Sequence, residues 1–208
     1  MITLRRATAG LALLSLAATA NAVAQCPGLE NFKTPPAGSW AEYKTTNGSM
    51  RLAVLGSEGT GVRMEMAMTT KEGPAIVQMV VPGYPYEMSG ITEMVFQRPG
   101  TPAMRMPTQM LGMMRDRMPK DMLAEACRNA HANRVGEETI TVPAGTFHTV
   151  HYHDAEKNTD VWLSNQLPFP MVQVKTGEDT IVLTGSGAGA KSQITGPIQD
   201  MPMGGPRN

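Results

Sequence analysis

The sequence has little net charge and no long apolar run, and each of these absences excludes a class of protein. It contains 18 basic and 18 acidic residues without a basic block. Nucleic acid is therefore not an expected partner, because phosphate binding needs clustered Lys and Arg. Beyond the first 24 residues, no segment approaches the roughly 20 apolar residues that span a bilayer. We expect no transmembrane anchor.

Motifs for enzymatic catalysis are also missing. A serine nucleophile needs a neighbouring base and an orienting group, and neither Ser164 nor Ser186 lies in a Gly-x-Ser-x-Gly sequence. The glycine-rich run at 185–189 follows a predicted strand but opens no helix, so it is not a phosphate-binding loop. We therefore expect a protein that is not an enzyme and has no cofactor.

Residues 1–24 have the pattern of a secretory signal peptide. Arg5 and Arg6 are followed by the short apolar run 11–18, and Ala22-Val23-Ala24 gives an A-x-A cleavage site. A second candidate site, Ala20-Asn21-Ala22, lies two residues earlier. The pattern predicts a bacterial protein exported to the periplasm. Lipidation is not favoured, because the position before Cys26 holds Gln25 rather than a small residue.

The chain has only two cysteines, Cys26 and Cys127. Two cysteines in an oxidising compartment usually pair, and this bridge would close a loop of about 100 residues, worth roughly 4–5 kcal/mol in chain entropy. A reactive thiol pair is the alternative, although no C-x-x-C spacing supports it. We favour the structural disulfide.

The remaining chain, about 184 residues, suits one domain. We assign it to residues 25–195 and expect a flexible tail at 196–208. Alternating apolar and polar residues predict strands, and Asn47-Gly48 predicts a type I′ turn between the first two. The predicted strands are 39–46, 50–57, 62–68, 75–81, 91–97, 138–142, 146–152, 160–164, 171–176 and 180–185, with a possible edge strand at 192–195.

Between the fifth and sixth predicted strands the spacing becomes helical. After a proline-bracketed connector at 99–107, Thr108 is the expected N-cap of a helix. Pro119 ends this helix and opens a second, predicted over residues 120–131. Met110, Met114 and Met118 recur at intervals of four on one side of the first helix.

Several segments together resemble a family of exported bacterial proteins that is similar to the lipoprotein-carrier (lipoprotein-localisation, LolA/LolB-like) superfamily. The resemblance covers roughly residues 38–195. It rests on the following segments: Gly38-Ser39-Trp40-Ala41-Glu42-Tyr43, Pro102-Ala103-Met104-Arg105-Met106-Pro107, Val142-Pro143-Ala144-Gly145-Thr146-Phe147, His151-Tyr152, Asp160-Val161-Trp162-Leu163-Ser164, Pro168-Phe169 and 172–175.

This resemblance implies the fold class: α+β, with a curved antiparallel sheet that forms an incomplete β-barrel around an apolar cavity and carries inserted lid-like helices. Carriers of the superfamily hold acyl chains in that cavity and have a cavity arginine that gates the lid.

Fourteen of the 18 methionines lie between Met50 and Met122. Met is unbranched and polarizable, and it suits soft apolar surfaces. In a half-open barrel, such surfaces are expected to face a cavity. We therefore predict a site for a hydrophobic small molecule or lipid; ordinary core packing is the alternative. The candidate ligand-binding residues are Met64, Met66, Met68, Met110, Met114, Met118, Trp40 and Trp162.

Copper binding is a second functional hypothesis, because thioethers suit Cu(I). Its candidate ligands are Met104 and Met106, the Met113-Met114 pair, and His151 and His153, which share one face of a strand. A third hypothesis is a structural or stress-related envelope protein whose core is filled by its own side chains. The favoured function is a periplasmic hydrophobic-ligand-binding protein that makes transient contact with an envelope lipoprotein or a membrane surface.

Overall fold

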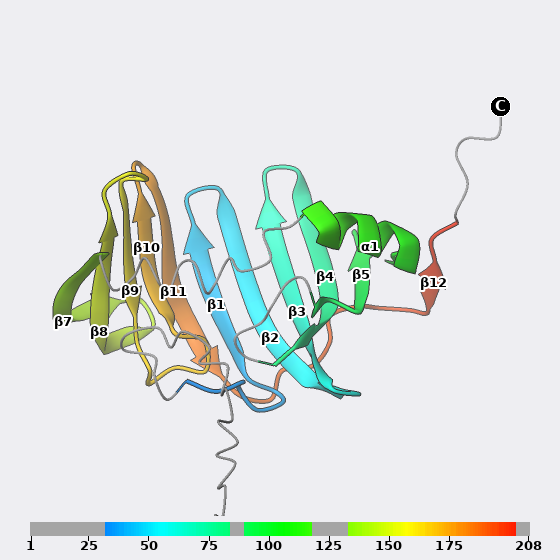
Figure 1. The fold of residues 1–208 in the computed structure, drawn as a ribbon, viewed down its shortest axis with the longest axis horizontal. Helices are drawn as coiled ribbons and strands as arrows, with labels where there is room; N and C mark the ends of the chain where they lie inside the picture. Colours follow the sequence, from blue (N-terminus) through cyan, green and yellow to red (C-terminus); the bar gives the residue numbers. More distant parts are fainter. Residues whose placement is uncertain (1–31, 84–89, 118–132, 203–208) are drawn as a thin grey trace, which may run out of the picture.

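The structure, a computed structural model, describes residues 32–83, 90–117 and 133–202. These residues form one large sheet and one helix (Figure 1). The elements are β1 (Trp40–Thr45), β2 (Gly48–Glu58), β3 (Gly61–Thr70), β4 (Gly73–Pro82), β5 (Glu93–Gln97), β6 (Ala103–Arg105), α1 (Thr108–Arg117), β7 (Arg134–Val142), β8 (Gly145–Asp154), β9 (Thr159–Leu163), β10 (Met171–Thr176), β11 (Asp179–Gly187) and β12 (Ile198–Asp200).

The sheet is open and strongly curved. Its twelve strands lie in the order β12-β6-β5-β4-β3-β2-β1-β11-β10-β9-β8-β7. All neighbours are antiparallel except β12 and β6, which are parallel. The pair β1 and β11 joins the amino-terminal meander to the carboxy-terminal one. The expected curved antiparallel sheet is therefore confirmed.

The strands predicted from alternation are observed as β1 to β5 and β7 to β11. These strands could be predicted because each buries one side against a core, so that apolar residues recur at every second position. The turn between β1 and β2 was misplaced: Thr46 and Asn47 form it, and Gly48 already pairs with Thr45. Neither turn residue has a positive φ, so the predicted type I′ turn is wrong.

Gly48 has a different role from the one predicted. A Cβ atom on Gly48 would lie 1.7 Å from the carbonyl oxygen of Thr69 on β3. The glycine is therefore required because a neighbouring strand passes close to its backbone, and its φ of +157° is one that other residues rarely adopt.

Two short strands appear where none was predicted. β6 lies in the expected connector, and β12 lies in the segment expected to be a flexible tail, where it pairs with β6. Residues 192–195, predicted as an edge strand, are not a strand; they cross the face of the sheet instead. Three-residue strands are too short to show a period, and only their pairing defines them.

Helix α1 forms where the first helix was predicted, and the structure describes it from Thr108 to Arg117. Its first backbone hydrogen bond runs from Leu111 N to Pro107 O. The residue that accepts this bond holds the capping position, so Pro107, rather than Thr108, is the N-cap. The predicted second helix at 120–131, the leader at 1–24 and both cysteines, Cys26 and Cys127, lie outside the described residues and stay predictions.

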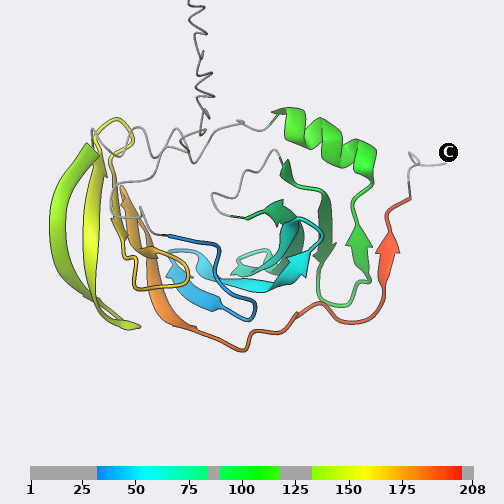
Figure 2. The same ribbon diagram turned by 60° about the horizontal axis from the view of Figure 1, so that its bottom comes forward.

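Helix α1 and the chain between β11 and β12 lie on opposite sides of the sheet. In Figure 2, α1 lies on the concave side, and the orange-to-red chain after β11 runs along the other side. Contacts agree with this view: Leu111 of α1 packs with Met94, whereas Gln193 bonds Glu65 on the opposite face. No helix of the described ranges is long and apolar enough to cross a membrane.

Candidate functional site

Strand register places seven methionines on one face of the sheet, which we call the methionine face. Residues directly opposite each other on paired strands point to the same side. Met64 pairs with Val54 and Met79, and Met79 pairs with Met94. Met68 pairs with Met50 in the same way. The methionine face comprises Met50, Met64, Met66, Met68, Met79, Met94 and Met104.

The middle of this face is a continuous apolar row across five strands, from β2 to β6. Every member of the row is partly exposed rather than fully buried. In order across the sheet, the row is Leu52, Met66, Val77, Phe96 and Met104.

Two hydrophobic clusters flank the centre of the face. One is built around Tyr43, Val54 and Leu183, the other around Met94 and Leu111, and Met64 packs against both. Met66 and Met68 belong to neither cluster among the described residues. The predicted trio Met64, Met66 and Met68 is thus brought together on one strand, but only Met64 is part of the packed core.

Helix α1 covers one end of the methionine face. Leu111 is 2% exposed and Met114 packs beside it, and Arg115 Nη1 donates a 3.2 Å hydrogen bond to Ile91 O. Met110 and Met113 point away from the sheet, with exposed fractions of 43% and 53%. Of the predicted helical methionines, Met114 therefore faces the sheet and Met110 does not, while Met118 lies outside the described residues.

Trp40 does not share a surface with the methionine face. It pairs with Ala53, which pairs with Glu65, and these residues define the opposite face. Trp40 Nε1 donates a 3.2 Å hydrogen bond to Ala188 O. A Cβ atom on Gly187 would lie 3.0 Å from the Trp40 ring, so the indole packs against a glycine-lined strand rather than a ligand surface.

Strand register places Trp162 on the opposite face too, within a polar cluster on β7, β8 and β9; its ring is also part of the hydrophobic cluster that contains Tyr43 and Leu183. Its ring stacks on His151 with a centroid separation of 4.4 Å, and its Nε1 donates to Glu138 Oε1 at 2.6 Å. His151 places Nδ1 3.1 Å from Glu138 Oε1 and Nε2 2.8 Å from Asp160 Oδ1. His153 Nδ1 approaches the same Asp160 oxygen at 3.0 Å.

The two histidines favour the ionised form of Asp160. The hydrogen bond from His151 is the main cause that lowers the pKa of Asp160; burial opposes it, and His153 adds a smaller lowering effect. This cluster orients side chains through hydrogen bonds and stacking. None of the residues joined in this cluster is positioned as a nucleophile.

The predicted copper ligands do not form one site. Met104 is on β6 and the methionine face, whereas His151 and His153 are on β8 and the opposite face. Eight strands separate β6 from β8 in the sheet. Met106 packs beneath α1. Within residues 32–83, 90–117 and 133–202, no three His, Cys, Asp or Glu side chains are arranged to hold a metal ion.

A buried carboxylate was missed by the sequence analysis. Glu65, which alternates with Met64 and Met66 along β3, is 2% exposed. Its carboxylate accepts hydrogen bonds from Gln78 Nε2 at 2.8 Å, Ser192 Oγ at 3.2 Å and Gln193 N at 3.0 Å. Alternation correctly separated Glu65 from the methionines, but it could not show that a distant segment covers it.

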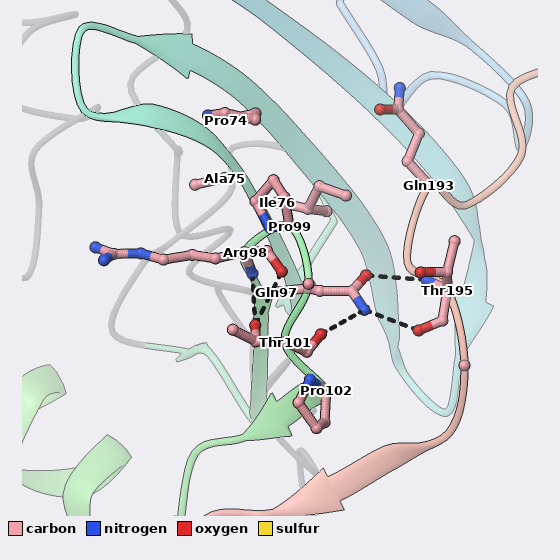
Figure 3. Close-up of a pocket in the computed structure, with 12 residues that line it drawn as sticks. Pro74, Ala75, Ile76, Gln97, Arg98, Pro99, Thr101, Pro102, Gln193 and Thr195 are labelled. Carbon is pink, nitrogen blue, oxygen red and sulfur yellow. Dashed lines mark hydrogen bonds between the residues drawn. The ribbon is translucent and has the colours of Figure 1, made fainter.

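A separate pocket of about 480 Å³ lies between the start of β4, the loop after β5 and the chain after β11 (Figure 3). Its wall includes Gln97, whose amide bonds the backbone of Thr195 through both its oxygen and its nitrogen. None of the sequence-predicted site residues lines it. The lining is Pro74, Ala75, Ile76, Gln97, Arg98, Pro99, Gly100, Thr101, Pro102, Gln193, Thr195 and Gly196.

Comparison with protein-family models and with curated proteins finds no match to this chain.

Proposed function

We propose that the protein is an exported, non-enzymatic binding protein for a hydrophobic ligand, a lipid or an acyl chain, and that the methionine face is its contact surface. The observation that supports this proposal is the position of Met66 and Met68. Met66 lies in the middle row of the apolar face, and Met68 lies beside it toward the β3–β4 turn; both are partly exposed and outside both packed clusters among the described residues.

The chemistry of the face suits an apolar ligand. A thioether side chain adapts its shape at little cost because it is flexible and polarizable. Fully burying an exposed apolar side chain is worth roughly 1.5–3 kcal/mol. A ligand that completes the burial of the partly exposed middle row would gain part of this free energy at each position. The sum of these gains must exceed the free-energy cost of association.

The resemblance to the lipoprotein-carrier superfamily supports the same proposal. An open curved sheet with a helix on its concave side is the arrangement that this resemblance implies. We propose that α1 acts as part of the cover over the ligand. Export to the periplasm and transient contact with an envelope lipoprotein or a membrane surface belong to this proposal.

Ligand binding is tested with protein purified without detergent. Native mass spectrometry should detect retained lipid, and a fluorescent fatty acid should bind and be displaced by an unlabelled one. The double variant Met66→Gln/Met68→Gln should weaken this binding by about tenfold or more, because two apolar contacts become polar.

The matched control is Met113→Gln, which makes the same chemical change on the outer side of α1 and should leave affinity unchanged. Equal binding by the double variant and the control would reject the methionine face as the site. Absence of any binding by the wild-type protein would favour the alternative of a structural protein with a self-filled core.

A further inference from the structure

Tyr43 is a buried polar group at the edge of the methionine face. It lies on β1 opposite Met50 and Leu183, so its side chain points to the methionine side of the sheet. The residue is 1% exposed and packs in the cluster that includes Phe169. Met50 in turn pairs with Met68, which makes Tyr43 the end of a row that leads into the partly exposed centre.

The hydroxyl group of Tyr43 has no hydrogen-bond partner among the residues that the structure describes. A buried donor left without an acceptor is costly, and few native groups remain in this state. Burial also raises the pKa of the Tyr43 phenol, so the group stays a neutral O–H donor. Such a donor is complementary to a carbonyl or carboxylate oxygen.

We propose that Tyr43 Oη donates a hydrogen bond to the carbonyl or carboxylate oxygen of an acyl ligand whose chain lies over Met50, Met68 and the middle row. This inference rests on the proposed function and specifies its ligand: a free fatty acid or an acyl ester rather than a pure hydrocarbon. From β1 to β5 the sheet spans four strand spacings, about 19 Å, which gives a long acyl chain room to extend toward α1.

Access to the hydroxyl requires a neighbouring side chain to move. Met50 is next to Tyr43, partly exposed and unbranched. A rotamer change at such a side chain occurs within nanoseconds when it is exposed and costs little, since methionine tolerates several conformations. The polar end of the ligand therefore enters beside Met50, and the apolar chain remains on the methionine face.

The test compares three ligands of one chain length: dodecanoic acid, methyl dodecanoate and dodecane. Each displaces N-phenyl-1-naphthylamine from the wild-type protein and from Tyr43→Phe. The variant should bind the acid and the ester about tenfold more weakly, the usual effect of one lost hydrogen bond, and should bind dodecane with unchanged affinity. Tyr152→Phe, which removes the hydroxyl of another buried tyrosine, should leave the ratio of ester to dodecane affinity unchanged.

Two further measurements complete the test. With methyl dodecanoate labelled with ¹³C at the carbonyl, the carbonyl stretch should lie at a lower frequency in the wild-type complex than in the Tyr43→Phe complex. Ligand-free Tyr43→Phe should unfold at the same temperature as the wild type or higher, because the substitution removes an unpaired hydroxyl.

Each contrary outcome has a distinct meaning. Equal affinities of the wild type and Tyr43→Phe for the ester would overturn the inference and leave hydrophobic binding intact; they are expected if a trapped water satisfies the hydroxyl. A lower unfolding temperature for Tyr43→Phe would overturn it as well, because the hydroxyl would then have a partner in the folded protein. Failure of all three ligands to displace the probe from the wild type would overturn the proposed function with it.

Discussion

Gln78 Nε2 donates a 2.8 Å hydrogen bond to Glu65 Oε2 beneath the chain segment that follows β11. The same carboxylate accepts from Gln193 N of that segment at 3.0 Å. Ser192 Oγ lies 2.6 Å from Gln78 Nε2 and completes the cluster. Because the side chains of Glu65 and Gln78 are buried, each depends on the other members of the cluster for its hydrogen bonds. The cluster therefore fixes the segment to the sheet.

Replacement of Glu65 by Ala should destabilise the protein by about 2–4 kcal/mol, because it leaves the buried amide of Gln78 without this acceptor, removes the acceptor of Gln193 N and opens a cavity. Urea unfolding followed by circular dichroism measures the loss. Limited proteolysis should also become faster in the segment that Gln193 anchors.

The conservative variant Glu65→Gln keeps an acceptor oxygen and should lose less stability than Glu65→Ala. The control is Glu72→Ala at the exposed turn between β3 and β4, with an expected change within about 0.5 kcal/mol. A Glu65→Ala variant as stable as this control would mean that the carboxylate does not hold the segment.

Gly48→Ala should destabilise the hairpin by more than about 1 kcal/mol, because the new Cβ atom would lie 1.7 Å from Thr69 O. Gly56→Ala on the same strand meets no atom within 4 Å and should be neutral or slightly stabilising. Thermal unfolding of the two variants gives the comparison. Similar melting temperatures would show that the two glycines are equivalent and that the close approach of Thr69 O to Gly48 does not affect stability.

Features of the fold that depend on residues close together in the sequence were predicted, and features that depend on distant residues were not. The alternation of Met64, Met66 and Met68 is visible within one strand, and it correctly placed the three side chains on one face. Glu65 was placed on the other face for the same reason. What covers that face depends on residues 192–195, far along the chain, and no local period reports such a contact.

The prediction of the site was limited in the same way. Residues that recur every four positions lie on roughly the same helical side, but the recurrence does not tell which direction within that side points at the sheet. Leu111 and Met114 meet it, so Met110 is exposed. Trp40 and Trp162 were selected because they are large and apolar, whereas strand register, which sequence alone does not give, places both away from the methionines.

Acid should weaken the cluster around Asp160. Its pKa is lowered in the folded protein, chiefly by the hydrogen bond from His151, so the unfolded chain takes up the proton at a higher pH than the folded protein does. The stabilising contribution is therefore complete above the ordinary carboxyl pKa of about 3.9 and is lost as the pH falls through the lower folded value.

Asp160→Asn should consequently flatten the acid side of the stability-against-pH curve, measured by urea unfolding between pH 2 and pH 6. The exposed Asp179 on β11 supplies the control Asp179→Asn, which should keep the wild-type curve. An unchanged acid limb in Asp160→Asn would show that the histidine contacts do not favour the ionised carboxyl in solution.

Oxidation of methionine provides a map of the covered and uncovered parts of the methionine face. Hydrogen peroxide converts a thioether into a sulfoxide at a rate that follows exposure, and peptide mass spectrometry locates each product. In ligand-free protein, Met110 and Met113 should react first, Met66 and Met68 next, and the buried Met94 last.

Saturation with dodecanoic acid should slow the reaction at Met66 and Met68 severalfold while Met113 reacts at its original rate, because a chain on the sheet shields only the concave side. Uniform slowing at all positions would instead indicate that the acid consumes peroxide or stabilises the whole protein, and no slowing at Met66 and Met68 would place the ligand elsewhere.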